Sequence, residues 1–498
     1  MKISAGKWVA AALLGGLLAT TGSFGMADKD EAQAVDAHQV EDAFGMPDKL
    51  TASQIGPDGV KVIITLASRL GGNLGPTAIS RLQDTAIRAL GLNKLEELTR
   101  FKYTPNLAFV VDHDLFRKLE ASPLIERIEP DRLNLPSLSQ STDRVEADQA
   151  WQAGSEGAGM TVAVLDTGVD TTHRAFKGRI VGEACYSSNG SFQGNRVSSA
   201  CPGGKKSATG RGAGRECPKA YECSHGTHVA AIVAGNDGRR KGVAPKANLL
   251  AVQVFSKVDG SACGRSGKCV TAYTSDIMKG LEWVYDQRKK HKIAAANLSL
   301  GGGRYKGSCD RDALARTIAL LNRAGIAVVA AAGNESYTDS VASPACITDA
   351  VTVGATDKRD GVANYSNSNK MIDLWATGSS ISAAVPGGGY GTKSGTSMAA
   401  PHVAGAIAVL KARYPKATTD QLVSIMKAQG PTVRDRRNGL ERKRLDLGKG
   451  MAAADAKYGA PDGGAGDPAP EPDDGDENGD GGDGGLVPDL LDGLLGGR

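Results

Sequence analysis

Residues 393–414 constrain the fold of this chain more than any other segment. They begin Lys-Ser-Gly-Thr-Ser-Met-Ala-Ala-Pro-His-Val-Ala-Gly, with Ser397 in fifth place, and continue as an alanine-rich apolar run. This composition predicts a buried helix, in which Pro401 falls at the edge of the first turn, where a missing N–H costs little. Ser397 would lie near the positive end of the helix dipole, among free N–H groups that stabilise an anion. The segment predicts a serine nucleophile, and the alternative is an ordinary glycine-led helix cap.

Two other segments offer partners for this serine. A serine hydroxyl is a poor nucleophile until a base accepts its proton and a third group orients the base. Residues 160–170 read Met-Thr-Val-Ala-Val-Leu-Asp-Thr-Gly-Val-Asp, which predicts a buried strand ending at Asp166. Residues 224–235 read Ser-His-Gly-Thr-His-Val-Ala-Ala-Ile-Val-Ala-Gly, with His225 at the start of an apolar helix. An aspartate, a histidine and a serine therefore each lie at the edge of a predicted element.

These three segments resemble the active-site motifs of the subtilisin-like serine peptidases. Asp166-Thr-Gly, His225-Gly-Thr-His and Thr-Ser397-Met-Ala follow one another in the order of that family. Position 399 is Ala, so the serine does not lie in the Gly-x-Ser-x-Gly motif of α/β-hydrolases. The resemblance spans about residues 140–455. It implies a catalytic triad of Asp166, His225 and Ser397 that hydrolyses peptide bonds through an acyl-enzyme.

The resemblance also implies an oxyanion hole and two walls of a substrate site. An apolar run ends at Asn334, whose amide would stabilise the oxyanion together with the Ser397 N–H; an asparagine here is also a common turn residue. The implied substrate-binding residues are Ser299, Leu300 and Gly301 on one side, and Ala331, Ala332 and Gly333 on the other. The segment at Ser299 is expected to pair with extended substrate backbone and to form one wall of the main specificity pocket, and the segment at Ala331 is expected to form the other wall. Their small side chains imply broad specificity with a preference for large apolar residues.

Strands and helices alternate through the segment that carries the motifs. Strands are predicted at 249–254, 294–300, 326–332 and 351–355, and helices at 275–288 and 310–324. This is the pattern of a parallel α/β sheet, which places functional residues at the carboxyl ends of its strands. The expected fold class is α/β, with a subtilisin-like catalytic domain at residues 141–455 preceded by a small α/β-plait prodomain.

The prodomain is expected at about residues 50–134. Its predicted elements are strand 60–65, helix 77–90, strand 106–111, helix 115–121 and strand 125–130. This order resembles the inhibitor prodomain of many subtilisin-like peptidases, and the alternative is an unrelated accessory domain. Residues 131–144 are polar and lack periodicity, as in a cleavable linker. We predict that the propeptide, residues 28–140, inhibits the enzyme until self-cleavage between residues 135 and 142.

The two ends of the chain differ strongly in composition. Residues 1–27 have a basic start and an apolar stretch too short to span a membrane comfortably, which predicts a signal peptide rather than an anchor. Residues 456–498 are rich in Gly and Asp and predict a disordered acidic tail. The negative charge of this tail is not apparent from the chain's net charge of +4.

The chain is expected to be secreted, to the exterior or the periplasm. Its expected partners are polypeptide substrates and its own prodomain, with neither nucleic acid nor stable membrane insertion.

Eight cysteines in an exported chain favour disulfides, and the absence of a Cys-x-x-Cys pair argues against zinc. The sequence does not fix how these cysteines pair. The segments that flank Cys263–Cys269 and Cys309–Cys346 resemble loops that can close, and Cys217–Cys223 and Cys185–Cys201 are two further candidate pairs. No cofactor is expected for the chemistry. Structural calcium is common in the family that the chain resembles, but no spacing here matches a calcium loop, so no metal site is assigned.

Residues 185–223 form a long glycine-rich interval with six basic residues, Arg196, Lys205, Lys206, Arg211, Arg215 and Lys219. They predict either a disulfide-pinned loop that steers acidic substrates or a solvated insertion. His173, His228 and His402 are expected to serve packing and local hydrogen bonds.

Two functional alternatives to a broad-specificity endopeptidase remain. One is a narrow-specificity processing peptidase, and the other is a non-catalytic binding protein on a peptidase scaffold.

Overall fold

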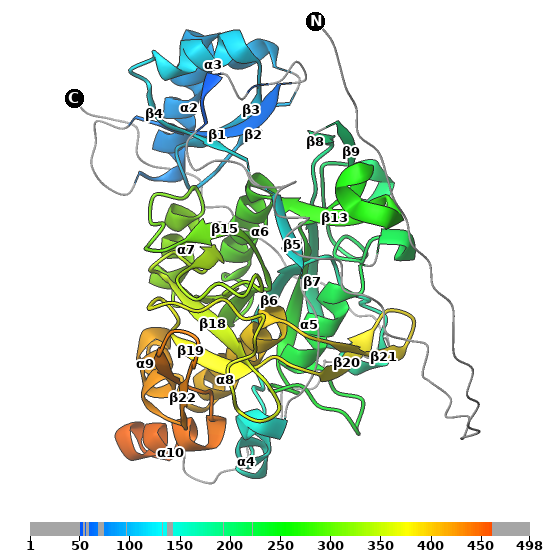
Figure 1. The fold of residues 1–498 in the computed structure, drawn as a ribbon, viewed down its shortest axis with the longest axis vertical. Helices are drawn as coiled ribbons and strands as arrows, with labels where there is room; N and C mark the ends of the chain where they lie inside the picture. The colour runs from blue at the N-terminus through cyan, green and yellow to red at the C-terminus, as the bar shows by residue number, and fades with distance from the viewer. Residues whose placement is uncertain are drawn as a thin grey trace, which may run out of the picture.

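The computed structural model describes residues 50–460, apart from 53–54, 56–58, 68–73, 96, 132, 137–142, 193 and 222. The predicted signal peptide, most of the predicted cleavage segment and nearly all of the acidic tail lie outside the described residues. Figure 1 shows a small N-terminal unit that rests on one end of a larger unit.

The N-terminal unit is an antiparallel four-stranded sheet with two helices. The strand order is β2–β3–β1–β4, formed by β1 (Val60–Leu66), β2 (Thr99–Arg100), β3 (Asn106–Val111) and β4 (Ile125–Pro130). The helices α2 (Pro76–Leu90) and α3 (His113–Glu120) share a core with the sheet. Asp112 caps α3 by accepting the N–H of Leu115 at 2.7 Å. All five predicted elements are present, and the two-residue strand β2 is an addition.

The larger unit contains an eight-stranded sheet in the order β10–β7–β11–β6–β14–β16–β18–β19. Its strands are β6 (Thr161–Asp166), β7 (Ile180–Tyr186), β10 (Ser207–Thr209), β11 (Asn248–Gln253), β14 (Ile293–Leu298), β16 (Ala327–Ala331), β18 (Ala350–Thr356) and β19 (Leu374–Thr377). All neighbours are parallel except β10 and β7. The predicted parallel α/β fold is therefore confirmed.

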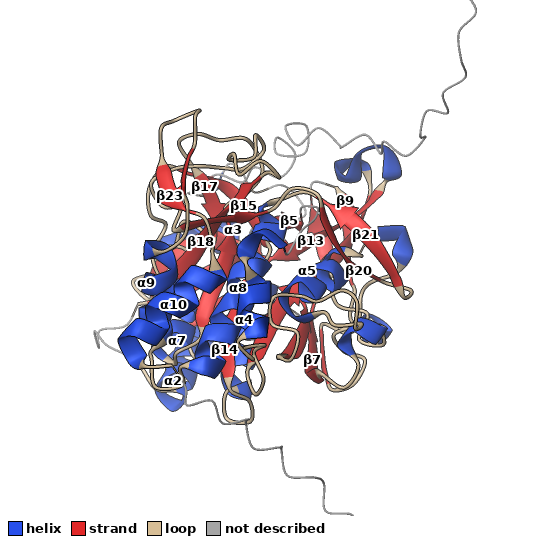
Figure 2. Ribbon diagram, turned by 90° about the horizontal axis from the view of Figure 1, so that it is seen from below, coloured by secondary structure: helices blue, strands red, loops and turns tan. Residues whose placement is uncertain are grey.

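Helices cover both faces of this sheet, and side chains alternate between the two cores. Val164 of β6 belongs to the core shared with α5 (His225–Ala234) and α8 (Thr396–Arg413), whereas Leu165 faces α6 (Thr274–Gln287) and α7 (Ala315–Arg323). Figure 2 shows α5 and α8 beside each other along the strands. Helix α8 is buried on every side through Leu410, as its apolar composition predicts.

Two predicted elements have different boundaries in the structure, and three helices were not predicted. The predicted strand 294–300 is divided between β14 and β15 (Leu300–Tyr305), because the chain leaves the large sheet at Ser299. The predicted helix 310–324 is shortened to α7, because Asp312 instead accepts the N–H of Leu314 in a preceding turn. The helices α4 (Ala147–Gln152), α9 (Thr419–Ala428) and α10 (Leu447–Tyr458) are additions that pack in the core of α8.

A second sheet crosses the carboxyl end of the large one in the order β17–β15–β5–β13–β12–β9–β8. Its further strands are β5 (Leu133–Pro136), β8 (Gly190–Phe192), β9 (Asn195–Ser199), β12 (Ser256–Asp259), β13 (Lys268–Tyr273) and β17 (Val341–Ser343). Strand β5 follows β4 of the N-terminal unit, so this unit supplies a central strand to the larger one. Residues 133–136 are thus extended and paired on both sides, although their sequence has the character of a linker.

The four predicted disulfides are all present, with Cα–Cα distances of 5.3–5.6 Å. The interval 185–223 contains β8, β9 and β10, so its backbone is built into the two sheets. Its six basic side chains are all exposed, as both alternatives for this interval require. None of the helices among the described residues is both long and apolar enough to cross a membrane.

Candidate active site

Asp166 and His225 meet at the carboxyl end of the large sheet. Asp166 ends β6 and His225 begins α5, and His225 Nδ1 lies 2.7 Å from Asp166 Oδ1. The Thr167 N–H donates to the same oxygen at 2.7 Å, and both side chains of the pair are buried. Gly226 permits this approach, because a Cβ there would lie 2.2 Å from the carbonyl oxygen of Gly168. The pair matches the arrangement in which a carboxylate orients an imidazole.

Ser397 lies at the same end of the sheet, in the first turn of α8. Its hydroxyl donates to the carbonyl of Ser299 at 3.0 Å, and Ser299 Oγ donates back to the Ser397 carbonyl at 2.7 Å. Ser299 directly follows β14, whose Leu298 pairs with Leu165 beside Asp166. Because α5 and α8 pack together, the structure brings Asp166, His225 and Ser397 to one edge.

Asn334 is tied to the residue that precedes Ser397. Its Oδ1 accepts the N–H of Thr396 at 2.8 Å and the Thr396 hydroxyl at 3.2 Å. The Gly333 N–H in turn donates to Thr396 Oγ1 at 3.1 Å. The turn after β16 is therefore joined directly to the start of α8.

The two predicted substrate walls have different surroundings. Leu300 and Gly301 pair with Pro136 and Leu135 of β5, so this wall already contacts an extended chain. At the other wall, the Ala332 N–H donates to Val353 at 3.0 Å, and the Ala332 carbonyl accepts from Ala342 at 2.9 Å. Ala331, Ala332 and Gly333 are buried at the base of the Asn334 turn, and the structure does not bring them into the β5 pairing.

The edge of β13 is a part of the site that sequence analysis missed. Ala272 pairs with Asn134 and Tyr273 with Leu133, on the side of β5 opposite to β15. The segment Val-Thr-Ala-Tyr before α6 has strand propensity, and this is the signal that could have identified it. The contribution of Asn367, which contacts the Asn334 turn, has no comparable local signal.

The other histidines near the site have structural surroundings, as predicted. Burial, followed by the charges of Lys393 and His225, lowers the pKa of His228 to about 3, and its Nε2 lies 3.0 Å from the Ile381 carbonyl. His173 accepts the Ala175 N–H at 3.1 Å, and His402 Nδ1 lies 2.6 Å from the Met398 carbonyl. Within the part of the chain that the structure describes, no group of three or more His, Cys, Asp or Glu side chains is placed to hold a metal ion.

Comparisons with known proteins agree with the predicted resemblance. A family model described as the subtilase family matches residues 157–458, which include all four candidate residues of the triad and oxyanion hole. The alkaline serine exoprotease A of Vibrio alginolyticus is 28% identical over 453 residues, covering 86% of this chain and 74% of that protein. The extracellular serine proteinase of Thermus sp. (strain Rt41A) is 33% identical over 363 residues, with 69% and 76% coverage. The major intracellular serine protease of Bacillus subtilis (strain 168) is 32% identical over 285 residues, with 56% and 76% coverage. The chain therefore belongs to the subtilase family and is a subtilisin-like serine protease.

Proposed function

We propose that this chain is made as a secreted precursor and matures into an endopeptidase with Asp166, His225 and Ser397 as its triad. Ser397 Oγ attacks the scissile carbonyl while His225 accepts its proton, and Asp166 orients the imidazole and stabilises the imidazolium. His225 then donates the proton to the leaving amine, and water releases the acyl-enzyme. The Asn334 amide and the Ser397 N–H donate to the oxyanion. No step of this chemistry requires a cofactor.

The observation that carries this proposal is the position of β5. Its residues pair on one side with β13 and on the other with β15, which is the geometry of β-strand addition. Its last residue, Pro136, pairs with Leu300, next to the Ser299 carbonyl that accepts the Ser397 hydroxyl. An extended polypeptide thus leads directly to the proposed nucleophile. This favours a peptidase over a non-catalytic binding protein, and self-cleavage at a bond between residues 135 and 142.

Contacts of the N-terminal unit with α6 support its proposed role as an intramolecular inhibitor. Asp131 accepts the Ser275 N–H at 2.8 Å, so a carboxylate caps the positive end of α6. Glu282 accepts the Tyr103 N–H at 3.0 Å. Phe101 is buried in the core that α6 also lines. These contacts hold β5 in the groove until the connecting chain is cut.

Secretion and substrate preference are the remaining parts of the proposal. Four disulfides are typical of exported proteins, and one relative is named as an extracellular proteinase. The alanines of the wall at residues 331–333 favour a roomy pocket for large apolar side chains. Cleavage of a peptide library would separate this broad preference from the narrow one of a processing peptidase.

A serine-directed fluorophosphonate tests the proposed function directly. We expect the mature protein to gain one label, located by peptide mapping on Ser397, because His225 makes this hydroxyl far more nucleophilic than the others. His225→Ala should label much more slowly, and Ser397→Ala should not label. Labelling of another serine, or equal labelling of wild type and Ser397→Ala, would contradict the triad.

The interface with the N-terminal unit should also weaken as the pH rises. Burial, together with the nearby Asp131 carboxylate, raises the pKa of Asp276 to about 6, although Lys61 opposes this. Lys61 Nζ lies 3.4 Å from Asp131 and 4.3 Å from the Tyr273 ring. We expect the pKa of Asp276 to fall toward its ordinary value of 3.8 once the N-terminal unit and its Asp131 leave, so that the carboxyl stays protonated to a higher pH in the bound form than in the released one. Binding is therefore fully favourable below the lower pKa and is weakened progressively up to the higher one.

We expect the isolated N-terminal unit to inhibit the mature enzyme about 10-fold or more less tightly at pH 7 than at pH 4, since one pKa unit corresponds to a tenfold change. Inhibition constants measured across this range provide the test. Asp276→Asn should remove most of the slope because residue 276 no longer titrates. An unchanged slope in Asp276→Asn would assign the pH dependence to other groups.

A further inference from the structure

The turn that carries Asn334 is strained. Gly333 has φ 103°, and Ser336 has φ 61°, a left-handed conformation that non-glycine residues rarely adopt. Such conformations persist where the surrounding structure imposes them. The Ser336 N–H donates to the Tyr365 carbonyl at 2.9 Å, and the Gly333 carbonyl accepts the N–H of Asn367 at 3.0 Å. The turn is therefore held by the neighbouring loop of residues 363–368.

Asn367 forms most of this connection. Its buried Oδ1 accepts the N–H groups of Glu335 at 3.1 Å and Tyr337 at 3.0 Å. Its Nδ2 donates to Glu335 Oε2 at 2.5 Å, and the same oxygen accepts the Asn334 N–H at 2.9 Å. Asn334 is thus fixed on one side by Thr396 and on the other by Glu335 and Asn367. A shift of the 363–368 loop would be transmitted to the Asn334 amide.

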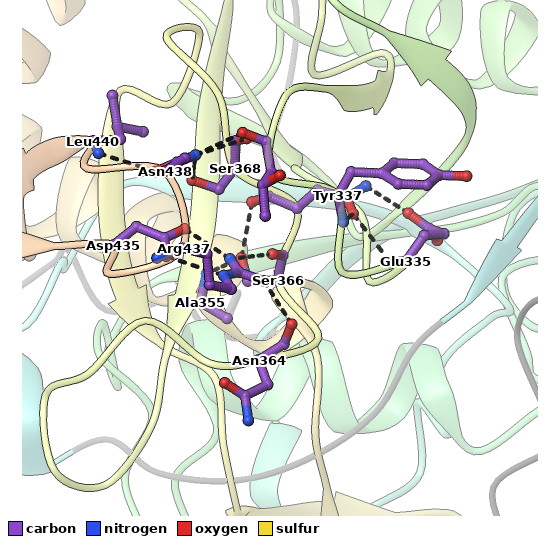
Figure 3. Close-up of polar contacts among 12 residues, drawn as sticks. Glu335, Tyr337, Ala355, Asn364, Ser366, Ser368, Asp435, Arg437, Asn438 and Leu440 are labelled. Atoms are coloured by element: carbon purple, nitrogen blue, oxygen red, sulfur yellow. Dashed lines mark hydrogen bonds and ion pairs between the residues drawn. The ribbon is translucent and has the colours of Figure 1, made fainter.

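Arg437 holds that loop from the outside, as Figure 3 shows. It lies in the turn of the C-terminal hairpin, formed by β22 (Thr432–Arg434) and β23 (Glu441–Lys443). Its guanidinium donates to the carbonyls of Asn364 at 2.6 Å and Ser366 at 2.7 Å. The neighbouring Asn438 donates to Ser368 Oγ at 2.9 Å. The C-terminal hairpin therefore contacts the loop on both sides of Asn367.

The orientation of Arg437 is itself fixed. Asp435, which is 1% exposed, accepts from Arg437 Nε at 3.0 Å and Nη2 at 2.8 Å. Burial would raise the pKa of Asp435, but the hydrogen bonds from Arg437 outweigh it and keep the pKa below its usual value. The ion pair with Asp435 uses one edge of the planar Arg437 guanidinium, so the other edge can donate to the two backbone carbonyls. Lysine cannot reproduce this forked geometry.

We propose that Arg437 is a positioning residue for the oxyanion hole, acting through the 363–368 loop and Asn367 to hold Asn334 in place. The inference rests on the proposed function, because it assigns to Asn334 the stabilisation of the oxyanion. Arg437 touches neither substrate nor Ser397 in this scheme. Its loss lets the strained turn relax, and the Asn334 amide moves away from the position that the transition state requires.

The test compares Arg437→Met, Asn334→Ala and the double variant as mature enzymes, with kcat expressed per titrated active site. Loss of one oxyanion donor typically lowers kcat by about 100- to 1000-fold. We expect Arg437→Met to lower kcat by about 10-fold with KM changed less than about twofold, since a displacement of ~1 Å costs up to about 100-fold. In the Asn334→Ala background, adding Arg437→Met should change kcat by less than about twofold because both changes act through the same donor. Arg436→Met, in the same turn but with an exposed side chain, is the matched control and should retain the wild-type kcat.

The outcomes separate this inference from the proposed function. A full loss in Asn334→Ala with a normal kcat in Arg437→Met would overturn the inference alone. So would a loss in Arg437→Met that multiplies in full with that of Asn334→Ala, because this would indicate a general effect. A normal kcat in Asn334→Ala would overturn the proposed oxyanion role and the inference with it. If Arg437→Met does not accumulate, Arg437→Lys tests the same fork with the charge retained.

Discussion

Ser397→Ala is expected to remain a full-length precursor, whereas the wild type loses the segment up to about residue 140. In the proposed mechanism the Ser397 hydroxyl is the nucleophile for self-cleavage, and removing such a nucleophile lowers kcat by about a millionfold. The variant should fold normally, because the substitution removes only the hydroxyl, whose hydrogen bond is to the Ser299 carbonyl. Intact mass after export from a secreting host measures the difference directly.

The matched control for this experiment is Ser266→Ala, which replaces an exposed serine in the same domain. It should mature like the wild type. If wild type and Ser397→Ala both remain full length, or if the host trims both alike, self-cleavage is not supported and the non-catalytic alternative gains weight. Maturation of Ser397→Ala in the presence of added wild-type enzyme would show in addition that cleavage can occur between molecules.

Asp166→Asn should lower kcat by about 10,000-fold and leave KM nearly unchanged, because the amide favours the wrong tautomer of the partner histidine. Asp166 Oδ1 accepts both from His225 Nδ1 and from the Thr167 N–H, each at 2.7 Å. An asparagine that places its nitrogen at this position requires His225 Nδ1 to accept instead of donate, and one that places its oxygen there lacks the charge that stabilises the imidazolium formed during attack. Hydrolysis of a peptide substrate, measured with titrated enzyme matured in trans, gives kcat and KM separately.

Asp170→Asn is the control for this second prediction. Asp170 is buried four residues later in the same motif, but its oxygens accept from Thr172 at 2.6 Å and from the Gly387 N–H at 3.0 Å. Its replacement should lower thermal stability and leave kcat per active site close to that of the wild type. An equal loss of kcat in the two variants would show that the effect of Asp166→Asn arises from folding rather than from His225.

The sequence predicted those parts of the site that are specified locally. Asp166 ends an apolar run and His225 begins another, so each position follows from the residues beside it. The edge formed by β13 and β15 around β5 was harder to predict, because Leu133 pairs with Tyr273 and Pro136 with Leu300, far away along the chain. The same limit applies to Arg437, whose acceptors lie more than 70 residues earlier and are backbone carbonyls that carry no side-chain signal.

In the proposed maturation, β5 leaves the sheet in which it lies, and this sets a condition on what the mature enzyme can cut. Once β5 leaves, β13 and β15 face each other across a gap one strand wide, and a substrate must supply that strand with both of its backbone edges available. A helix or a paired strand has its backbone groups already bonded, so the substrate must first unfold locally over the cleaved segment. The rate of cleavage of a folded protein then reports the free energy of that local opening. The disulfides Cys217–Cys223 and Cys263–Cys269 each join cysteines with a sequence separation of 6, and loops closed in this way resist extension. These loops are therefore protected in part from cleavage by other copies of this chain.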